Sequence, residues 1–380
     1  MRTQRSFWLA GLAGLALIAC TEEGPVEPRT DVGLSASVAG LAGPGAVYVM
    51  SNAPAGNEIL VFDRSADGDL SNAVAFASGG DGTGAGLGNQ ASLILTQDHR
   101  RLYAVNAGSD DISAFEVDRT GLQLIGAPVP SGGDLPISLT VHGDLLYVLN
   151  GGGAGNINGF RIGTDGGLTP IPGSTRPLGG ATPAQIQFTP DGDVLVVTEK
   201  DSNTLSTYTV GADGIASGPN TQPSAGQTPF GFNFNQRGDL VVSEAFGGAP
   251  GASTASSYRV QRDGDLELIS GPVGTTQSAA CWIAIGQNGK YAYTTNTGSG
   301  TISSLAIGAG GSLTLVDAVA GVTGAGSAPQ DAAFTPGGRF LYVRNNGGNI
   351  GAFRIEKNGQ LTHIEDFGPL PVGANGMAVR

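Results

Sequence analysis

Two glutamates occupy equivalent places in a repeated pattern and could act together as acid and base. The pattern is a short apolar strand that ends in a polar residue, and Glu199 and Glu244 stand where the other copies have asparagine. Two carboxylates that share a shielded site can differ in pKa, so that one accepts a proton while the other donates it. We therefore predict Glu199 and Glu244 as the catalytic residues, with Glu199 as the general base.

The same two glutamates could have a structural or a cation-binding role instead. A side-chain oxygen at a strand end can accept hydrogen bonds from the backbone of the next turn, and the asparagines of the column are expected to do so. A calcium-like cation held by both carboxylates and the ring of asparagines is also chemically possible. No zinc site is expected, because no pair of His or Cys residues has ligand spacing. Catalysis, turn capping and cation binding all stay open at this point.

Further polar or aromatic residues lie at strand ends that should face the same central opening. We predict that these residues bind the substrate: Gln185, Trp282, Asp331, Asn150, Asn296 and Asn375. The three histidines are expected elsewhere, His99 and His142 in turns on the opposite face and His363 on an outer strand. A Ser-His-Asp device needs a histidine beside its nucleophile, so this class of hydrolase is not expected.

The elements that position these residues follow from the repeat itself. The chain has 64 glycines and 21 prolines in 380 residues, which argues against long helices. Apolar strands such as LYAVN from Leu102 and LYVLN from Leu146 recur at a spacing of about 44 to 54 residues, which is typical of propeller blades. The polar strand ends are Asn52, Asn106, Asn150, Glu199, Glu244, Asn296 and Asn345. We predict an all-β protein, a seven-bladed β-propeller with four antiparallel strands per blade.

The two ends of the repeat region should meet. The last strand, from Asn375 to Val379, has no partner strands after it, while the first blade, from Ala46, has no inner strand before it. We expect the C-terminal strand to pair with the N-terminal blade, because an open ring would expose two sheet edges. Glycine-rich loops at 78–89 and 246–256 should lie on the face of the polar column, where long loops commonly bind ligands.

The N-terminal residues are typical of an exported lipoprotein. Two arginines and an apolar run precede Leu17-Ile18-Ala19-Cys20, which resembles a lipobox. We predict a signal peptide at 1–19, acylation of Cys20, a flexible tether at 20–45 and the propeller at 46–380. The expected location is the bacterial cell envelope, lipid-anchored in the periplasm or at the outer membrane or outside, with membrane contact through the anchor alone.

The charge balance limits the partners. The formal net charge is −13 at pH 7, and no basic patch follows the first five residues. A phosphate backbone needs clustered basic residues, so nucleic acid is excluded as a partner. We expect a monomer that takes a small-molecule substrate or an envelope ligand, and we expect no cofactor.

The strand motifs over residues 46–380, including LYVLN, ISAFEV from Ile112 and GQLT from Gly359, resemble the seven-bladed propeller lactonase family. That family includes propeller-type 6-phosphogluconolactonase and carboxymuconate cyclases. The resemblance implies a hydrolase or a cycloisomerase that acts on a lactone-type ring at the central opening. The alternative is a non-catalytic envelope propeller that binds a glycan, a peptide or a protein.

One segment departs from the family pattern. The family's Gly-x-x-Pro-Arg-His segment aligns with residues 180–185, and its Asn-Glu pair aligns with Thr198 and Glu199. The resemblance therefore implies that Glu199 corresponds to the family's glutamate, whereas Ala184 and Gln185 stand in place of its arginine and histidine. An arginine is the usual ligand of an anionic group. The departure implies a neutral ring rather than a phosphorylated one.

Overall fold

The computed structural model describes residues 44–119, 121–286 and 288–380. The predicted signal peptide, Cys20 and most of the tether lie outside these residues. Among them, no helix is long and apolar enough to cross a bilayer. The helical structure in the described ranges is one short 3-10 turn, η1 (Phe246–Gly248).

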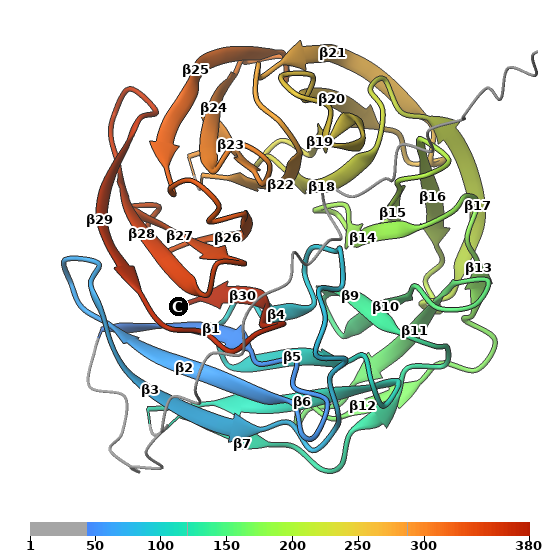
Figure 1. Ribbon diagram of the computed structural model, residues 1–380. Helices are drawn as coiled ribbons and strands as arrows, with labels where there is room; N and C mark the ends of the chain where they lie inside the picture. The colour runs from blue at the N-terminus through green and yellow to red at the C-terminus, as the bar shows by residue number, and fades with distance from the viewer. Residues whose placement is uncertain (1–43, 120, 287) are drawn as a thin grey trace, which may run out of the picture.

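Seven antiparallel sheets stand around a common axis, as Figure 1 shows. Blade 1 holds β1 (Gly45–Met50), β2 (Glu58–Arg64) and β3 (Leu70–Ala77), with β30 (Asn375–Val379) innermost. Blade 2 holds β4 (Leu93–Leu95), β5 (Arg101–Asn106), β6 (Asp111–Val117), β7 (Leu122–Leu124) and β8 (Val129–Pro130). Blade 3 holds β9 (Pro136–His142), β10 (Leu145–Asn150), β11 (Asn156–Ile162), β12 (Leu168–Pro170) and β13 (Arg176–Pro177).

The other four blades have four strands each. Blade 4 holds β14 (Pro183–Phe188), β15 (Val194–Glu199), β16 (Thr204–Val210) and β17 (Ala216–Pro223). Blade 5 holds β18 (Pro229–Phe234), β19 (Asp239–Glu244), β20 (Thr254–Val260) and β21 (Leu266–Gly274). Blade 6 holds β22 (Ala280–Ile285), β23 (Tyr291–Asn296), β24 (Thr301–Ile307) and β25 (Leu313–Val322). Blade 7 holds β26 (Pro329–Phe334), β27 (Phe340–Asn345), β28 (Asn349–Ile355) and β29 (Leu361–Phe367).

The predicted fold and the predicted ring closure are confirmed. β30 pairs with β1 in antiparallel register, with Val379 opposite Val47 and Ala378 opposite Tyr48. The first strand begins at Gly45, one residue before the predicted start of the propeller. In blades 2 and 3 the outermost strand is split into two pieces, which fits the prolines in these segments because proline cannot donate a ladder hydrogen bond.

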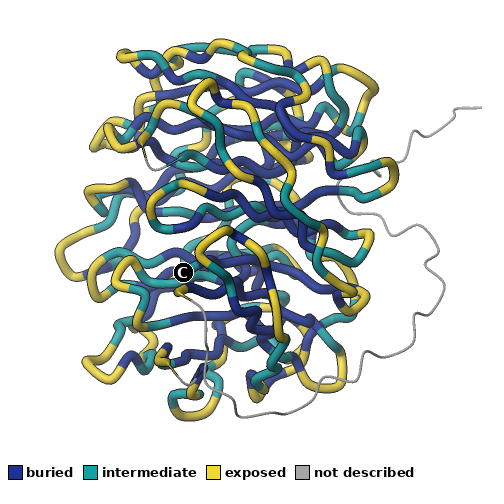
Figure 2. The backbone as a smooth tube through the Cα atoms, turned by 90° about the vertical axis from the view of Figure 1, so that its left-hand side faces the viewer, coloured by how far each residue is buried: buried dark blue, intermediate teal, exposed yellow. Residues whose placement is uncertain are grey.

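The ring has two faces that differ in their connections. We call the face with the blade-to-blade connections, such as residues 78–92, the loop face. The opposite face carries the turns between the innermost and second strands, such as residues 96–100, and we call it the turn face. Figure 2 shows buried chain within the sheets and exposed chain at the turns. The core is the apolar packing between neighbouring blades, so the axis is left to polar side chains and loops.

A hydroxyl of one blade repeatedly bonds to the outer hairpin turn of the next blade. The Tyr103 hydroxyl donates to Gly166 O at 3.0 Å, and the Tyr147 hydroxyl donates to Gly214 O at 2.7 Å. Tyr342 joins blade 7 to blade 1 in the same way, through a 2.6 Å bond to Gly68 O. These bonds satisfy buried hydroxyls and fix the angle between blades, which holds the inner strands in place around the axis.

Candidate functional site

Glu199 ends β15 and its carboxylate is fully buried. One oxygen accepts backbone N–H groups of Gly179 at 3.0 Å and Gly180 at 2.8 Å. The other oxygen accepts the hydroxyls of Thr204 and Ser206, both at 2.8 Å. Two donors lie on the connection that enters blade 4 and two on β16, so Glu199 ties this connection to the third strand of its own blade.

Glu244 has the same arrangement in blade 5. Its carboxylate is fully buried and accepts the Gly226 backbone N–H at 2.9 Å and the Ser224 hydroxyl at 3.3 Å. The Thr254 hydroxyl donates to its second oxygen. Burial raises the pKa of Glu244, and the hydrogen bonds from these donors oppose that rise. The cause of the shift is therefore desolvation, and no neighbouring carboxylate contributes to it.

The expectation that both carboxylates face a shared opening is wrong. Each is enclosed by the loop that enters its own blade, and within the described ranges no hydrogen bond joins Glu199 to Glu244. The geometry matches the turn-cap alternative. Their catalytic role stays a prediction that a variant enzyme must test. No group of three or more His, Cys, Asp or Glu side chains in the described part of the chain is placed to hold a metal ion.

Two of the three asparagines predicted to bind substrate also cap turns. Asn150 donates to Asn156 Oδ1 at 2.8 Å. Asn296 donates to the hydroxyls of Thr301 at 3.1 Å and Ser303 at 2.9 Å. Both asparagines are fully buried. Asn150, Asn296 and the two glutamates are thus local braces beneath the loop face.

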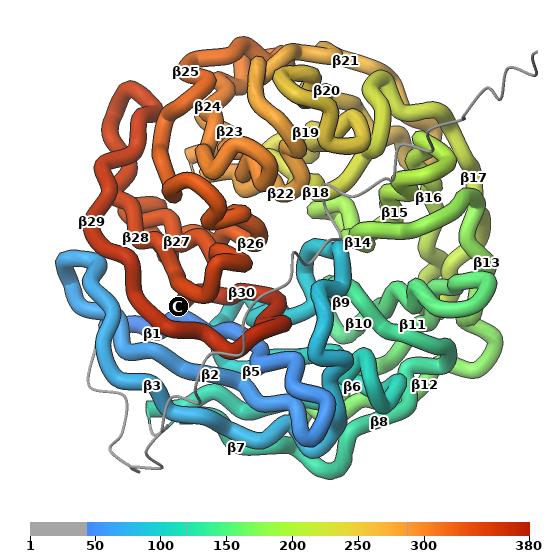
Figure 3. Tube along the Cα trace, in the orientation of Figure 1, coloured from blue at the N-terminus to red at the C-terminus, as the bar shows by residue number. Residues whose placement is uncertain are grey.

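The axis at the loop face is occupied by residues 82–92, which we call the axial loop. In Figure 3 the chain between β3 and β4 reaches towards the middle of the ring. Its first part is held by Asn52 of blade 1, whose amide donates to Ala85 O at 2.7 Å and to the Thr83 hydroxyl at 3.1 Å. The Asn52 side-chain oxygen accepts the Thr83 N–H at 3.0 Å.

The second part of the axial loop bridges blades on different sides of the axis. Gln90 N donates to Ala184 O of blade 4 at 3.1 Å. The Gln90 side-chain amide donates to Ile283 O of blade 6 at 2.9 Å and accepts Ile283 N at 3.2 Å. Ala91 O accepts Leu139 N of blade 3 at 2.8 Å. The glycine-rich loop that was expected to bind ligands therefore closes the central opening.

Trp282 and Asn375 lie where the sequence places them, at the starts of innermost strands, but they contact the axial loop. The Trp282 indole donates to Asn89 O at 2.6 Å, and Asn375 Oδ1 accepts the Ser92 hydroxyl at 2.7 Å. Both side chains are buried. They fix the axial loop in position, and a ligand could reach them on the loop face only if that loop moved.

Asp331 is buried on β26 beside the same loop. Its carboxylate accepts the Gly376 N–H at 3.0 Å and the Ala91 N–H. Burial raises the pKa of Asp331 to about 6, against the opposing effects of Arg344 and of these two N–H groups. Burial also lowers the pKa of Arg344 to about 10, because a charged guanidinium is disfavoured away from water.

The Asp331 carboxyl should make stability depend on pH. The folded protein holds this proton up to about pH 6, whereas an unfolded chain releases it near pH 4. The contribution is therefore full at low pH and lost as the pH rises through 6. We expect the unfolding free energy of wild type, minus that of Asp331→Asn, to fall by about 2 kcal/mol between pH 4.5 and 7.5. Urea denaturation at several pH values measures this difference, and a constant difference would contradict the assignment.

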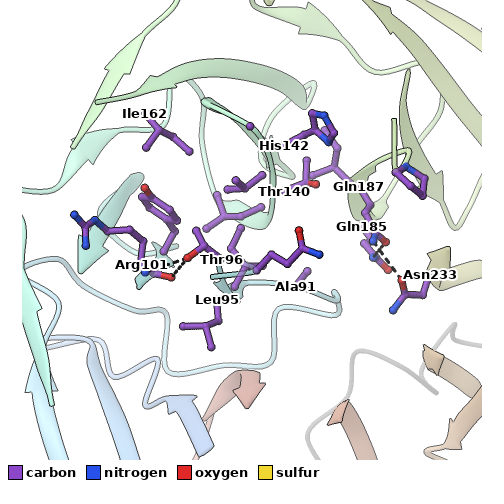
Figure 4. Close-up of a pocket in the computed structure, with 18 of the residues that line it drawn as sticks. Ala91, Leu95, Thr96, Arg101, Thr140, His142, Ile162, Gln185, Gln187 and Asn233 are labelled. Atoms are coloured by element: carbon purple, nitrogen blue, oxygen red, sulfur yellow. Dashed lines mark hydrogen bonds between the residues drawn. The ribbon is translucent and has the colours of Figure 1, made fainter. Parts of the chain in front are cut away.

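A cavity of about 940 Å³ lies on the turn face between the axial loop and blades 2, 3 and 4, with Asn233 of blade 5 at its side, and we call it the axial cavity. Figure 4 shows Gln185, Gln187 and Asn233 along one wall, with Thr140 and His142 nearby and Thr96 and Arg101 across from them. Gln90 and Ala91 of the axial loop also line it, so the loop that closes the opposite face forms part of its boundary. Of the predicted site residues, Gln185 lines this cavity.

The wall between blades 4 and 5 is a chain of uncharged amides. Gln185 donates to Phe232 O at 2.9 Å and accepts Phe232 N at 2.8 Å, which fixes its orientation. Gln187 accepts from Gln185 and donates to Asn233 Oδ1, both at 3.3 Å. Gln187 and Asn233 are only partly buried, so their amides can also meet a ligand. Gln185 and Gln187 alternate on one strand, a period-two signal through which the sequence could have revealed this wall.

The charged residues at this cavity are already paired. Arg101 donates to Glu116 at 3.3 Å. Hydrogen bonds from the Thr96 hydroxyl and the Arg100 backbone N–H hold the pKa of Asp98 below its usual value. His142 ends β9 with its ring packed against Phe188, at 5.8 Å between ring centroids. The predicted placement of His142 on the turn face is confirmed, but the axial cavity lies on that face too, so a histidine does line it.

Comparison with known proteins decides the family. The model of the family described as Lactonase, 7-bladed beta-propeller, matches residues 47–176, 168–270 and 244–374. The chain belongs to this lactonase family. The match covers nearly the whole propeller, in agreement with the resemblance carried by the strand motifs. No curated protein sequence matches significantly.

Solved structures similar to this lactonase-family chain share its fold. A proposed 6-phosphogluconolactonase from Bacteroides fragilis is 23% identical with a TM-score of 0.66, over 88% of this chain and 98% of that chain. The periplasmic gluconolactonase PpgL of Pseudomonas aeruginosa is 18% identical with a TM-score of 0.66, over 88% and 99%. A protein from Lactobacillus plantarum is 20% identical with a TM-score of 0.69, over 88% and 99%. At these identities the likeness concerns the fold alone.

Proposed function

We propose that this protein is a lactonase that hydrolyses a neutral lactone-type ring in the cavity on the turn face. The observation that carries the proposal is the cavity itself: about 940 Å³ beside the axial loop, lined by apolar side chains together with amides, hydroxyls and one imidazole. Membership of the lactonase family supports the reaction class. The name of the Pseudomonas aeruginosa neighbour, a gluconolactonase, is consistent with an uncharged ring.

The side chains present can supply each step of such a hydrolysis. His142 takes a proton from a water molecule, whose oxygen attacks the ring carbonyl carbon. Amide N–H groups of Gln187 or Asn233 and the Thr140 hydroxyl are the donors available to the carbonyl oxygen as it gains negative charge. The bond from the carbonyl carbon to the ring oxygen then breaks. The imidazolium returns its proton to that oxygen, which leaves as a hydroxyl.

The charges at the cavity favour neutral lactone rings over anionic ones. Arg101 is already paired with Glu116, and the Asp98 carboxylate stands at the same cavity. No further arginine lines the cavity to hold a phosphate. We expect kcat/KM for glucono-lactone to exceed that for its 6-phosphate by roughly tenfold or more, which corresponds to one unpaired charge contact.

A panel of neutral and phosphorylated lactones, followed by pH-stat, tests the proposal. Glu199→Gln is the decisive control, because it removes the other candidate base. We expect Glu199→Gln to keep turnover within a few fold and to lose about 1–2 kcal/mol of stability, as capping residues do. If a folded Glu199→Gln protein had its turnover lowered a hundredfold, Glu199 and Glu244 would be the catalytic residues and His142 would not. If no lactone is hydrolysed, the non-catalytic envelope propeller is the better interpretation.

The proposed setting is the cell envelope. The support is the sequence of residues 1–20, with its apolar run and its Leu-Ile-Ala-Cys end. An acylated Cys20 would hold the propeller near a membrane. Partitioning of the wild-type protein between detergent and water measures this, and recovery from the aqueous phase would contradict it.

A further inference from the structure

Lys200 is a buried amine that neither the proposed hydrolysis nor the polar column uses. It follows Glu199 at the end of β15, where its backbone N–H donates to Thr182 O at 2.9 Å. Its side chain is 6% exposed. Nζ donates to Gly88 O of the axial loop at 2.6 Å and lies over the Phe230 ring, 4.9 Å from the centroid. One of its three N–H groups is thus accounted for by a protein acceptor.

Lys200 lines a second cavity, of about 390 Å³, on the loop face. This cavity lies between blades 3 and 4 and shares no lining residue with the axial cavity. Its walls are glycines and small or apolar side chains, with Thr182 as the other polar residue; the larger apolar ones are Leu87, Leu135, Ile137, Leu178 and Pro183. Lys200 is the one charged residue in this lining. The cavity thus offers space for an apolar molecule beside a single lysine, whose Nζ contacts Gly88 O and the Phe230 ring just outside the lining.

Burial shifts the protonation equilibrium of Lys200 towards the neutral amine. Burial lowers the pKa of Lys200 to about 8, and the nearby Asp201 opposes this shift. Asp201 is exposed and accepts the Thr182 hydroxyl at 2.6 Å, while the Glu199 carboxylate is occupied by its four donors. No ion pair to Lys200 is found in the described part of the chain. At pH 7 roughly a tenth of such an amine is unprotonated, against well under a hundredth for an exposed lysine.

We propose that Lys200 captures an apolar aldehyde or ketone in this cavity as an imine. The Nζ lone pair attacks the carbonyl carbon, and a proton moves from nitrogen to oxygen to give a carbinolamine. Loss of water from the carbinolamine forms the C=N bond, so the step consumes one carbonyl compound and releases one water. The reaction is reversible and requires no oxidant or reductant. This activity is separate from the lactone hydrolysis proposed above, because it uses a different cavity on the other face.

The chain has three lysines, which makes the test simple. Lys290 and Lys357 are both exposed and serve as internal references. The full-length protein is incubated with hexanal, the imine is reduced with borohydride, and the three lysine peptides are compared by mass spectrometry. At pH 7 we expect hexyl labelling of Lys200 to exceed that of either reference by roughly tenfold or more. Labelling of Lys200 should reach half its maximum near pH 8, while labelling of the references should still rise above pH 9.

Two variants separate imine capture from a purely structural lysine. Lys200→Arg keeps a charged donor towards Gly88 O and the same fold, and its peptide should carry no label. Ala154→Trp fills the cavity from its rim while leaving Lys200 intact, and it should reduce Lys200 labelling fivefold or more. Lys290→Arg is the matched control and should leave Lys200 labelling unchanged. Equal labelling of all three lysines, or labelling of Lys200 that ignores Ala154→Trp, would overturn the proposal.

Discussion

Removal of residues 375–380 is expected to abolish the soluble, folded protein. These residues include the whole of β30, the innermost strand of blade 1. The ladder continues past the strand, since Ala46 N donates to Arg380 O at 3.1 Å and Arg380 N donates to Ala46 O at 2.8 Å. Met377 and Val379 are each under one-tenth exposed. Their burial contributes about 1.5–3 kcal/mol each, a large share of a typical net stability of roughly 5–15 kcal/mol.

The truncation also exposes a sheet edge in the middle of the ring. β1 would keep β2 on one side but would lose its inner partner from Val47 to Met50, and an unpaired apolar strand edge invites aggregation. The measurement is the soluble yield and the melting temperature of the truncated protein beside a variant that lacks Arg380 alone. The single deletion keeps β30 and should melt close to wild type. A six-residue truncation that melts within a few degrees of wild type would show that the closure does not carry the stability of the ring.

Replacement of His142 by asparagine is expected to lower lactone turnover about a hundredfold or more, the usual contribution of a general base. Asparagine cannot accept and release protons near neutral pH, but it is polar and smaller than histidine. We expect kcat to fall while KM stays within a few fold, because the amide wall that binds the ring is unchanged. Added imidazole should restore part of the turnover, since the axial cavity is open to solvent.

His99→Asn is the matched control for His142→Asn. His99 occupies the equivalent turn of blade 2 but does not line the cavity. Its backbone has φ of 58°, a left-handed conformation that asparagine tolerates well. The control should therefore fold and turn over as wild type does. If both variants keep full activity, the base is not His142, and the glutamate pair regains its place as the leading candidate.

The fold was predictable because its signal is local and repeated. Strands of alternating residues with a polar end recur seven times, so an error in one copy is corrected by the others. The closure followed from counting: β30 was a strand without a blade, and blade 1 was a blade without an inner strand. Neither inference needed knowledge of side-chain contacts.

The site was harder to predict, because it depends on contacts distant in sequence. The polar column correctly indicated equivalent positions, but the loop that folds over Glu199 and supplies its donors comes from the strand connection before β14. The axial loop reaches blades 1, 3, 4 and 6, through residues as far apart as Asn52 and Ile283. No local pattern distinguishes a glycine-rich loop that binds a ligand from one that fills the axis.

Because of the axial loop, the centre of the ring is closed at the loop face and open at the turn face. Gln90 and Ala91 of this loop line the axial cavity, so a reaction product that left by the loop face would have to displace the loop. Substrate and product would then use the same opening on the turn face. Each molecule of hydroxy acid would have to leave before the next lactone could enter. Such an enzyme would show competitive inhibition by its own product, and its rate would be sensitive to the size of the ring.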